Sequence, residues 1–323
     1  MTVRRSLFRC AVALTMALVV GSGAFAQSYP TKPIQLFVAF APGGAGDIVA
    51  RVMSKALSKR LGQPIVIENR PAPMVAVVST AKARPDGHTL MVAGSGTALS
   101  NALFKRLPYD LMKDFVHVST MASFDLTLIA GTQSPFNSTA DVLAYARAHP
   151  GKLTIGTVRL GSTQNLTAEM FKSMTGIDAL IVPYKTSGEI LTALRSGDIQ
   201  VAFEILPPIL NQLAAKSLKP LAVTSSKRFP GLPQVPTLAE SGVPGFEAAS
   251  WNGISAPAGT PQAVIDRLVR EIQAAVTSPE VQKELQSLGM VAQAGTSAQM
   301  TERMEADIAK WSAVIDKAGI ERQ

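Results

Sequence analysis

Cysteine is almost absent from this chain of 323 residues, which contains a single one, Cys10. Cys10 precedes the apolar run Ala11–Val20, whereas a lipid-anchored cysteine would follow such a run at its cleavage point. The residues after position 26 contain no cysteine, which excludes disulfides and zinc–thiolate sites there. We therefore expect the stability of the folded protein to come from its apolar core.

Long hydrophobic runs are also missing. The run Ala11–Val20 is much shorter than the roughly 20 residues that a helix needs to cross a membrane, and no later run exceeds it without interruption. Three arginines precede it and Ala24-Phe25-Ala26 follows it, an order typical of a secretory signal with an A-x-A cleavage site. We expect residues 1–26 to be a signal peptide, cleaved between Ala26 and Gln27, and the mature protein to be soluble in the periplasm.

Signals of catalysis are weak. The chain has three histidines, His88, His117 and His149, and none belongs to an H-E-x-x-H helix, while no serine lies in a G-x-S-x-G elbow. We interpret all three histidines as structural or solvated. Asp110 and Asp114 lie in a predicted loop without a nucleophile or metal ligand beside them. The sequence predicts neither an enzyme nor a metal site.

Complete nucleotide-binding motifs are missing as well. Gly44-Ala45-Gly46 and Gly94-Ser95-Gly96 both begin a G-x-G-x-x-G pattern, but Val49 and Leu99 replace the third glycine. The chain also has no G-x-x-x-x-G-K-[ST] phosphate loop. We expect no cofactor.

Basic residues outnumber acidic ones, 31 to 23, which gives a formal net charge of +8. The lysines and arginines are scattered, and no basic run alternates with aromatic residues, which make up only 6% of the chain. This distribution argues against a nucleic-acid-binding surface. A mildly positive field favours small anionic ligands.

Short apolar, β-branched runs alternate with segments of helical periodicity from Ile34 onward. The clearest unit consists of a strand at Ile34–Phe40, a turn at Pro42–Gly46 and a helix at Asp47–Leu61, with Asp47 at or near the helix N-cap. Such an alternation predicts an α/β protein with a parallel sheet. We expect further strands over residues 64–68, 89–93, 126–130, 153–157, 179–182, 199–203, 221–224 and 251–256.

The chain without its signal is too long for one compact core, which suggests two lobes. After Gly259 the sequence is predicted to be helical, over Pro261–Val276, Pro279–Leu288 and Ser297–Ala318. A helical tail without its own strands does not easily form a separate domain. We expect it to pack back onto the first lobe, which makes that lobe discontinuous in sequence.

Three loops rich in glycine, serine or threonine each follow a predicted strand: Pro42–Asp47, Gly94–Thr97 and Gly161–Thr163. A helix N-terminus offers unpaired N–H groups and a partial positive charge, and glycine lets an anion approach closely. Ligands of open α/β sheets bind at the carboxyl ends of strands, where these loops lie. The loops are therefore candidates for carboxylate binding, with ordinary tight turns as the alternative.

Two large side chains near these loops have two interpretations each. Arg159 precedes the third loop and is either a bidentate partner of a ligand carboxylate or a solvated loop charge. Trp251 is either a core residue or a wall of a ligand cleft between the lobes.

Six ordered motifs resemble one family, the Bug-type extracytoplasmic receptors of tripartite tricarboxylate transporters. They cover most of the chain after the signal: YPTKPIQLFVAFAPGGAGDIVAR (29–51), IENRP (67–71), PDGHTL (85–90), VPYK (182–185), VPTLAESGVPGFE (235–247) and WNGISAPAGTP (251–261). The resemblance implies a type II periplasmic-binding-protein fold, a clamshell of two α/β lobes joined by two crossing strands, without catalysis. The crossings then fall near Leu126 and Trp251, with residues 27–125 plus 250–323 in lobe 1 and 126–249 in lobe 2.

The resemblance also implies a site in which loop amides and ordered waters hold one carboxylate of the ligand. The residues of lobe 1 that correspond to it are Phe40, Ala41, Pro42, Gly43, Gly44 and Asp47, with Ser95 and Thr97 nearby. Lobe 2 would contribute Gly161, Ser162 and Thr163, while the distal end of the ligand would meet Arg159, Asn165, Tyr184 and Glu204.

The chain departs from the family pattern at three places. Pro71-Ala72-Pro73-Met74-Val75 replaces a glycine-rich run, Asn165 stands where the family often has histidine, and Gly46 where it often has serine or threonine. The identity of the ligand therefore cannot be inferred from the family. The resemblance implies a monomer that delivers a small carboxylate to membrane permease subunits; a periplasmic sensor is the alternative, and a secreted hydrolase the third.

Overall fold

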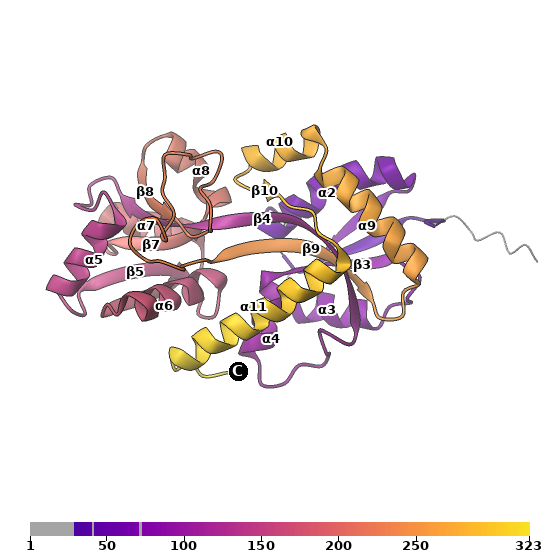
Figure 1. Cartoon of the computed structure of the whole chain (residues 1–323), viewed down its shortest axis with the longest axis horizontal. Helices are drawn as coiled ribbons and strands as arrows, with labels where there is room; N and C mark the ends of the chain where they lie inside the picture. Colours follow the sequence, from indigo (N-terminus) through magenta and orange to yellow (C-terminus); the bar gives the residue numbers. More distant parts are fainter. Residues whose placement is uncertain (1–28, 41, 71–72) are drawn as a thin grey trace, which may run out of the picture.

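The computed structural model describes residues 29–323 except 41, 71 and 72, so the predicted signal peptide and its cleavage site lie outside the described residues. The described chain forms a mixed β-sheet with helices on both faces (Figure 1). Two long strands, β4 (Phe115–Gly131) and β9 (Ala249–Pro257), run through its middle and connect the two halves. This is the two-lobed α/β architecture that the sequence predicts.

The sheet of lobe 1 is built on three parallel strands, β1 (Ile34–Val38), β2 (Ile65–Asn69) and β3 (Thr89–Gly94). β1 lies between β2 and β3, and β9 adds antiparallel beside β3. The first part of β4 pairs with β9, and the short β10 (Val291–Ala292) pairs with the other side of β4. The carboxyl ends of the three parallel strands share one edge.

The sheet of lobe 2 contains β5 (Leu153–Val158), β6 (Ala179–Tyr184), β7 (Val201–Ile205) and β8 (Leu218–Val223). β5 lies between β6 and β7 with all three parallel, and the end of β4 pairs antiparallel with β7 and β8.

The pairing of β4 changes between two adjacent residues. Asp125 is still opposite Ala249 of β9, while Leu126 is opposite Ile205 of β7. This change supports the predicted crossing near Leu126. The exact division into 27–125 plus 250–323 and 126–249 stays a prediction.

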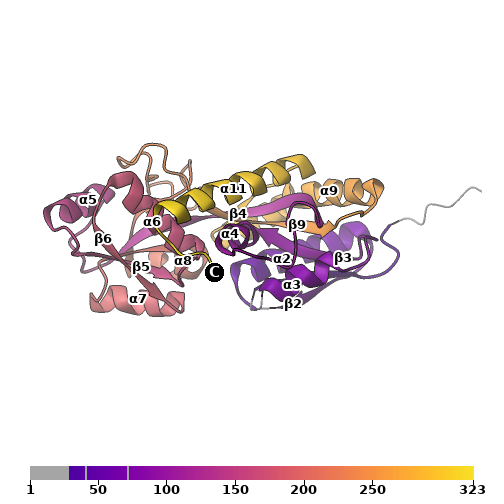
Figure 2. The same cartoon turned by 90° about the horizontal axis from the view of Figure 1, so that it is seen from below.

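Helices connect the strands and cover the faces of the sheet (Figures 1 and 2). Those that follow strands of lobe 1 are α2 (Ala45–Leu61), α3 (Pro73–Ala81), α4 (Ser95–Leu103), α9 (Gln262–Val276) and α10 (Pro279–Ser287). Those of lobe 2 are α5 (Thr139–Ala148), α6 (Thr163–Thr175), α7 (Ser187–Ser196) and α8 (Leu206–Ala214).

The last helix, α11 (Ser297–Lys317), contacts both halves of the molecule. It packs on α4 and β4, as expected for a tail that returns to lobe 1, and it also contacts α6. Trp311 and Ile315 of α11 belong to the same buried cluster as Leu166 and Phe171 of α6. α11 therefore connects the lobes in addition to the two crossing strands.

Buried apolar side chains lie on both faces of the sheet because its strands alternate. In β1, Ile34, Leu36 and Val38 enter one cluster and Phe37 enters another on the opposite face. Trp251 is fully buried, so it is a core residue and not a wall of a ligand cleft. Its indole Nε1 donates to Asp307 of α11 over 2.7 Å, and its backbone N–H donates to Ser95 Oγ over 2.9 Å.

Two local predictions were wrong. The predicted strand over 126–130 is only the end of β4, whose first part, residues 115–125, escaped prediction. Ser95–Thr97 form the first turn of α4 and not a loop, because Gly94 ends β3 directly before the helix. The N-cap of α2 is Gly44, and Asp47 lies near it in the first helical turn, as predicted.

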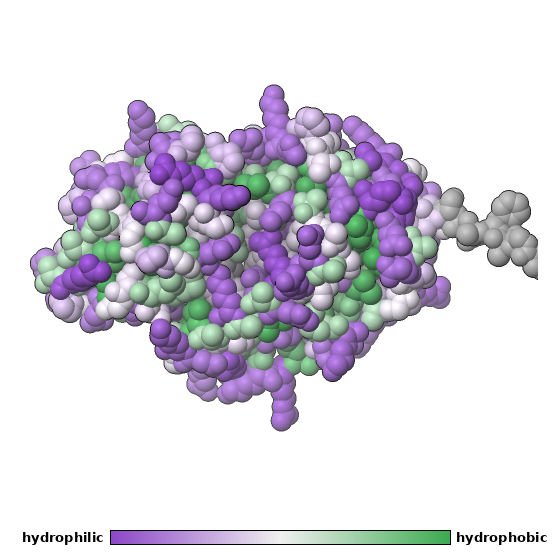
Figure 3. Space-filling view, viewed as in Figure 1, coloured by the Kyte–Doolittle hydropathy of each residue, from purple (hydrophilic) through white to green (hydrophobic). Residues whose placement is uncertain are grey.

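The surface shows no helix suited to a membrane. Among residues 29–323, apart from the three left undescribed, no helix is both long and apolar enough to cross a bilayer. Hydrophilic and hydrophobic residues alternate over the face shown in Figure 3. Leu180, at 57% exposure, and Leu160, at 59%, are among the large apolar side chains that remain exposed.

Candidate functional site

The first predicted loop, between β1 and α2, is fixed by two side chains. Asp47 is buried, and its Oδ2 accepts hydrogen bonds from the Gly43 N–H over 2.9 Å and from Arg51 Nε over 2.8 Å. Asn69, at the end of β2, donates to Asp47 Oδ1 over 2.8 Å and to the Phe40 carbonyl over 3.1 Å. Asn69 and Asp47 thus hold both ends of the loop.

The carboxyl of Asp47 is ionised in this setting. Burial acts to raise its pKa, but the hydrogen bonds from Arg51, Asn69 and Gly43, together with the charge of Arg51, hold the pKa below the usual value for aspartate. The charge of Arg51 and the N–H groups of Gly43 and Asn69 therefore compensate its negative charge. We assign to Asp47 a role in shaping the loop, while its direct contact with a ligand stays a prediction.

The first turn of α2 has backbone N–H groups that are candidates for anion binding. Gly44 is the N-cap, and no side chain among the described residues caps the helix. The first N–H groups of a helix have no partner within the helix and carry a partial positive charge. Pro42 and Gly43 are exposed beside this turn, whereas Ala41 lies outside the described residues.

Phe40 explains one departure from the family pattern. A Cβ atom on Gly46 would lie 2.3 Å from Cδ2 of the Phe40 ring, so no larger residue fits at position 46 without moving that ring. The ring occupies the space in which a serine or threonine side chain would lie. The half-buried Phe40 ring therefore lies over Gly46 and packs against the core of lobe 1.

The hydroxyls of Ser95 and Thr97 have internal partners. Ser95 Oγ is fully buried and accepts the Trp251 N–H, and Thr97 Oγ1 accepts the Gly94 N–H over 3.3 Å. Both residues lie at the carboxyl end of β3, as predicted, and both stabilise the start of α4. Their contact with a ligand stays a prediction.

The lobe 2 loop after β5 is likewise held from within. Ser162 caps α6: its Oγ accepts from the Asn165 N–H over 3.1 Å and donates to the Val158 carbonyl over 2.8 Å. Asn165 is buried and accepts the Gly161 N–H over 3.0 Å. The histidine-to-asparagine departure thus places a loop-binding amide at this position. Thr163 is the first residue of α6 and is partly exposed.

Two further predicted residues lie at the carboxyl ends of β5 and β6. The backbone N–H of Arg159 donates to the Tyr184 carbonyl over 2.9 Å, which joins the two strand ends. The Arg159 side chain is exposed and Tyr184 is partly buried. Burial, with a smaller effect of the Asp198 and Glu189 charges, raises the pKa of Tyr184. Both interpretations of Arg159 remain open.

Glu204 lies near the end of β7 and is fully buried. Its Oε1 accepts from Gln164 Nε2 over 2.9 Å and from the Ile205 N–H over 2.8 Å. Gln164, in the first turn of α6, was not predicted as a site residue. No motif indicates it, because the carboxyl that holds it belongs to a strand 40 residues further along the chain.

Side chains of the two lobes pack against each other at two points. Ile205 of β7 packs against the same apolar cluster as Phe40, Ala45 and Ile48 at the start of α2. On the other side, a Cβ atom on Gly161 would lie 2.6 Å from Leu103 Cδ2 of α4.

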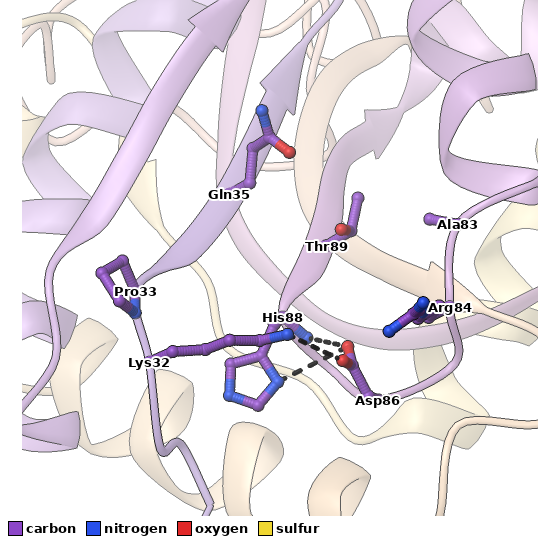
Figure 4. A pocket seen from close by; sticks show the side chains of 8 residues that line it. All are labelled: Lys32, Pro33, Gln35, Ala83, Arg84, Asp86, His88 and Thr89. Carbon is purple, nitrogen blue, oxygen red and sulfur yellow. Dashed lines mark hydrogen bonds and ion pairs between the residues drawn. The ribbon is translucent and has the colours of Figure 1, made fainter.

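A separate cavity of about 350 Å³ lies at the opposite, amino ends of β1 and β3 (Figure 4). Lys32 Nζ and Asp86 Oδ2 form an ion pair there over 3.1 Å, and the His88 N–H donates to Asp86 Oδ1. His88 Nε2 accepts the Thr31 N–H over 3.2 Å, which assigns the ring proton of the neutral form to Nδ1. The PDGHTL motif thus anchors the start of the described chain, and His88 is structural as predicted.

Comparison with known proteins identifies the family. Residues 49–320 match the model of the tripartite tricarboxylate transporter family receptor. BugT of Bordetella pertussis is 33% identical over 298 residues, which cover 91% of each chain. The chain therefore belongs to this receptor family, as its motifs indicate.

Two solved structures of Rhodopseudomonas palustris proteins are similar over nearly their whole length. Rpa4515 with adipate is 37% identical with a TM-score of 0.80, and the match covers 91% of this chain and 99% of that one. MatC with bound malate is 30% identical with a TM-score of 0.74, covering 89% of this chain and 100% of the other. Both support the binding-protein fold.

Proposed function

We propose that this protein captures a small carboxylate in the periplasm and delivers it to the membrane subunits of a tripartite transporter. The observation that carries the proposal is the open first turn of α2, preorganised by Asp47 and Asn69, in a chain whose similar structures hold adipate and malate. Preorganised amides bind an anion without the entropic cost of ordering a loop.

In this proposal the ligand carboxylate docks on the α2 turn first. Contacts from lobe 2, among them the starts of α6 and α8, then favour a closed arrangement of the lobes over an open one. The packing of Ile205 of lobe 2 against the apolar core of lobe 1 supports such a closed arrangement. The transporter's membrane subunits would bind the closed form, and the protein itself would act as a monomer without a cofactor.

A thermal-shift screen tests the proposal. The panel contains succinate, malate, adipate, citrate, aspartate and benzoate, with the corresponding amides as uncharged controls. A ligand present at 100 times its Kd should stabilise the native protein by about 2.7 kcal/mol, because it binds only the folded state. Stabilisation by one or more acids and none by their amides is the expected result. A flat response to all acids would contradict the proposal.

A further inference from the structure

The carboxyl of Glu204 is held in a specific orientation at the junction of the lobes. It lies at the carboxyl end of β7, beside the first turn of α6 and directly before α8. Oε1 accepts two N–H groups, from Gln164 and Ile205, while Oε2 is buried and has no hydrogen-bond partner within the described part of the chain. A buried polar atom without a partner is costly, and the Ser187 hydroxyl is close enough to act on this carboxyl.

The acid is shielded from solvent. Burial raises the pKa of Glu204, against the opposing effect of the hydrogen bonds from Gln164 and Ile205 and of the nearby Ser187 hydroxyl. Oε1 acts as an acceptor in either protonation state, because it receives two N–H groups. A proton on the carboxyl would therefore reside on Oε2.

This acceptor fixes the direction of the Gln164 side-chain amide. Since Oε1 of Glu204 needs a donor, Gln164 must turn its NH₂ group toward Glu204 and its carbonyl oxygen away. Gln164 is only partly buried, in contrast to Glu204.

We propose that Gln164, oriented by Glu204, recognises a hydrogen-bond-donating substituent, a hydroxyl or an ammonium group, on the bound carboxylate. The inference rests on the proposed carboxylate-binding function. An amide oxygen attracts such a donor and disfavours a second bare carboxylate at the same place. Gln164 is then a specificity-determining residue, and Glu204 a positioning residue that acts through it.

Matched ligands test the inference directly. Succinate, malate and aspartate share a four-carbon dicarboxylate skeleton and differ by a hydrogen, a hydroxyl or an ammonium at one carbon. Isothermal titration calorimetry should give at least tenfold tighter binding of malate or aspartate than of succinate by the unmodified protein. The comparison of malate with aspartate shows whether the site prefers a hydroxyl or an ammonium group.

Gln164→Met has a similar length but no amide, and it should reduce the preference over succinate to less than about threefold. The affinity for succinate itself should stay within about threefold, which separates lost recognition from a lost fold.

Glu204→Gln can donate as well as accept, so it no longer fixes the direction of the Gln164 amide, and the preference should fall to an intermediate value. Gln262→Met is the control, because Gln262 makes a similar bond to Asp266 over 2.8 Å on the exposed face of α9.

The outcomes separate the two proposals. If succinate binds as tightly as malate and aspartate, or if Gln164→Met keeps the preference, the inference on Gln164 is wrong and the carboxylate-binding function stands. If none of the three acids binds but other acids stabilise the protein, the assigned ligand class is wrong. If no acid binds at all, the proposed function fails and the inference fails with it.

Discussion

At the scale of single residues, polar side chains stabilise the loops of the candidate site. A sequence motif does not show whether such a side chain supports a loop or contacts a ligand. Asp47, Ser95, Ser162 and Asn165 were predicted on the basis of their loops, and each donates or accepts within its own lobe. The sequence places these residues at the carboxyl ends of strands, and their contact with a ligand stays a prediction. It cannot tell a loop support from a ligand contact, because both use the same polar atoms.

Asn69→Ala tests the support of the α2 loop. It removes the donor to Asp47 Oδ1 and to the Phe40 carbonyl, and it leaves the buried carboxylate with one partner fewer. We expect a loss of about 1–3 kcal/mol in the free energy of unfolding. Ligand affinity should fall as well, because the first turn of α2 loses its preorganisation.

Urea unfolding and calorimetry with the best ligand measure the two effects. Asn211→Ala, an exposed residue of α8, is the control and should change stability by less than about 0.5 kcal/mol. Unchanged affinity for Asn69→Ala would separate loop support from ligand binding.

At the scale of elements, the alternating units of β1–α2 and β5–α6 were predictable because one strand, one turn and one amphipathic helix lie together in sequence. The first part of β4 was not, since Phe115–Asp125 mixes apolar residues with small polar ones that the crossing strand buries on both faces. Gln164 was missed for a related reason. Its partner Glu204 reaches it only through the parallel pairing of β5 with β7.

Strand β4 carries two buried titratable groups with opposite effects on stability. Burial raises the pKa of Asp125 from 3.8 to about 6, against a weaker effect of the Ser225 hydroxyl. Burial also lowers the pKa of His117 from 6.5 to about 4. The native state favours protonated Asp125, whose contribution is lost as pH rises from about 4 to about 6. It favours neutral His117, whose contribution is lost as pH falls through the same range.

Asp125→Asn should remove one of these two opposing effects. The stability of the variant relative to the unmodified protein should increase by about 2 kcal/mol between pH 4 and pH 7 and stay constant above pH 7. The variant alone should lose stability toward acid pH, because the contribution of His117 is no longer balanced. Urea unfolding at several pH values measures this, with the exposed Asp266→Asn as control. A pH-independent difference would contradict the assignment.

At the scale of the whole molecule, two crossing strands and α11 connect the lobes, and two apolar contacts bring their loops together. A motif-based comparison predicts the crossings, because the family pattern spans the chain. It does not predict the contact of Gly161 with Leu103, since neither residue lies in a motif that specifies the other. How closely the lobes approach each other here depends on how side chains such as Leu103 pack, and motifs do not encode this packing.

Gly161→Ala tests whether this contact matters for binding. The new Cβ would approach Leu103 Cδ2 to 2.6 Å, and the backbone φ of +72° disfavours any residue other than glycine. The strain should lower stability by about 1–2 kcal/mol. The clash should in addition move the lobe 2 loop away from α4 and weaken ligand binding, if the closed arrangement requires this contact.

Gly176→Ala separates these two effects, because Gly176 has a similar φ of +67° but no atom within 4 Å of the position that a Cβ would take. It should lower the melting temperature to a similar extent and leave the ligand affinity unchanged. Combining Gly161→Ala with Leu103→Ala removes the clash and retains the backbone strain. Affinity should then recover, while stability should fall by about a further 2–5 kcal/mol because Leu103 is a buried core residue. Equal affinity of Gly161→Ala and Gly176→Ala would show that ligand binding does not depend on the approach of Gly161 to α4.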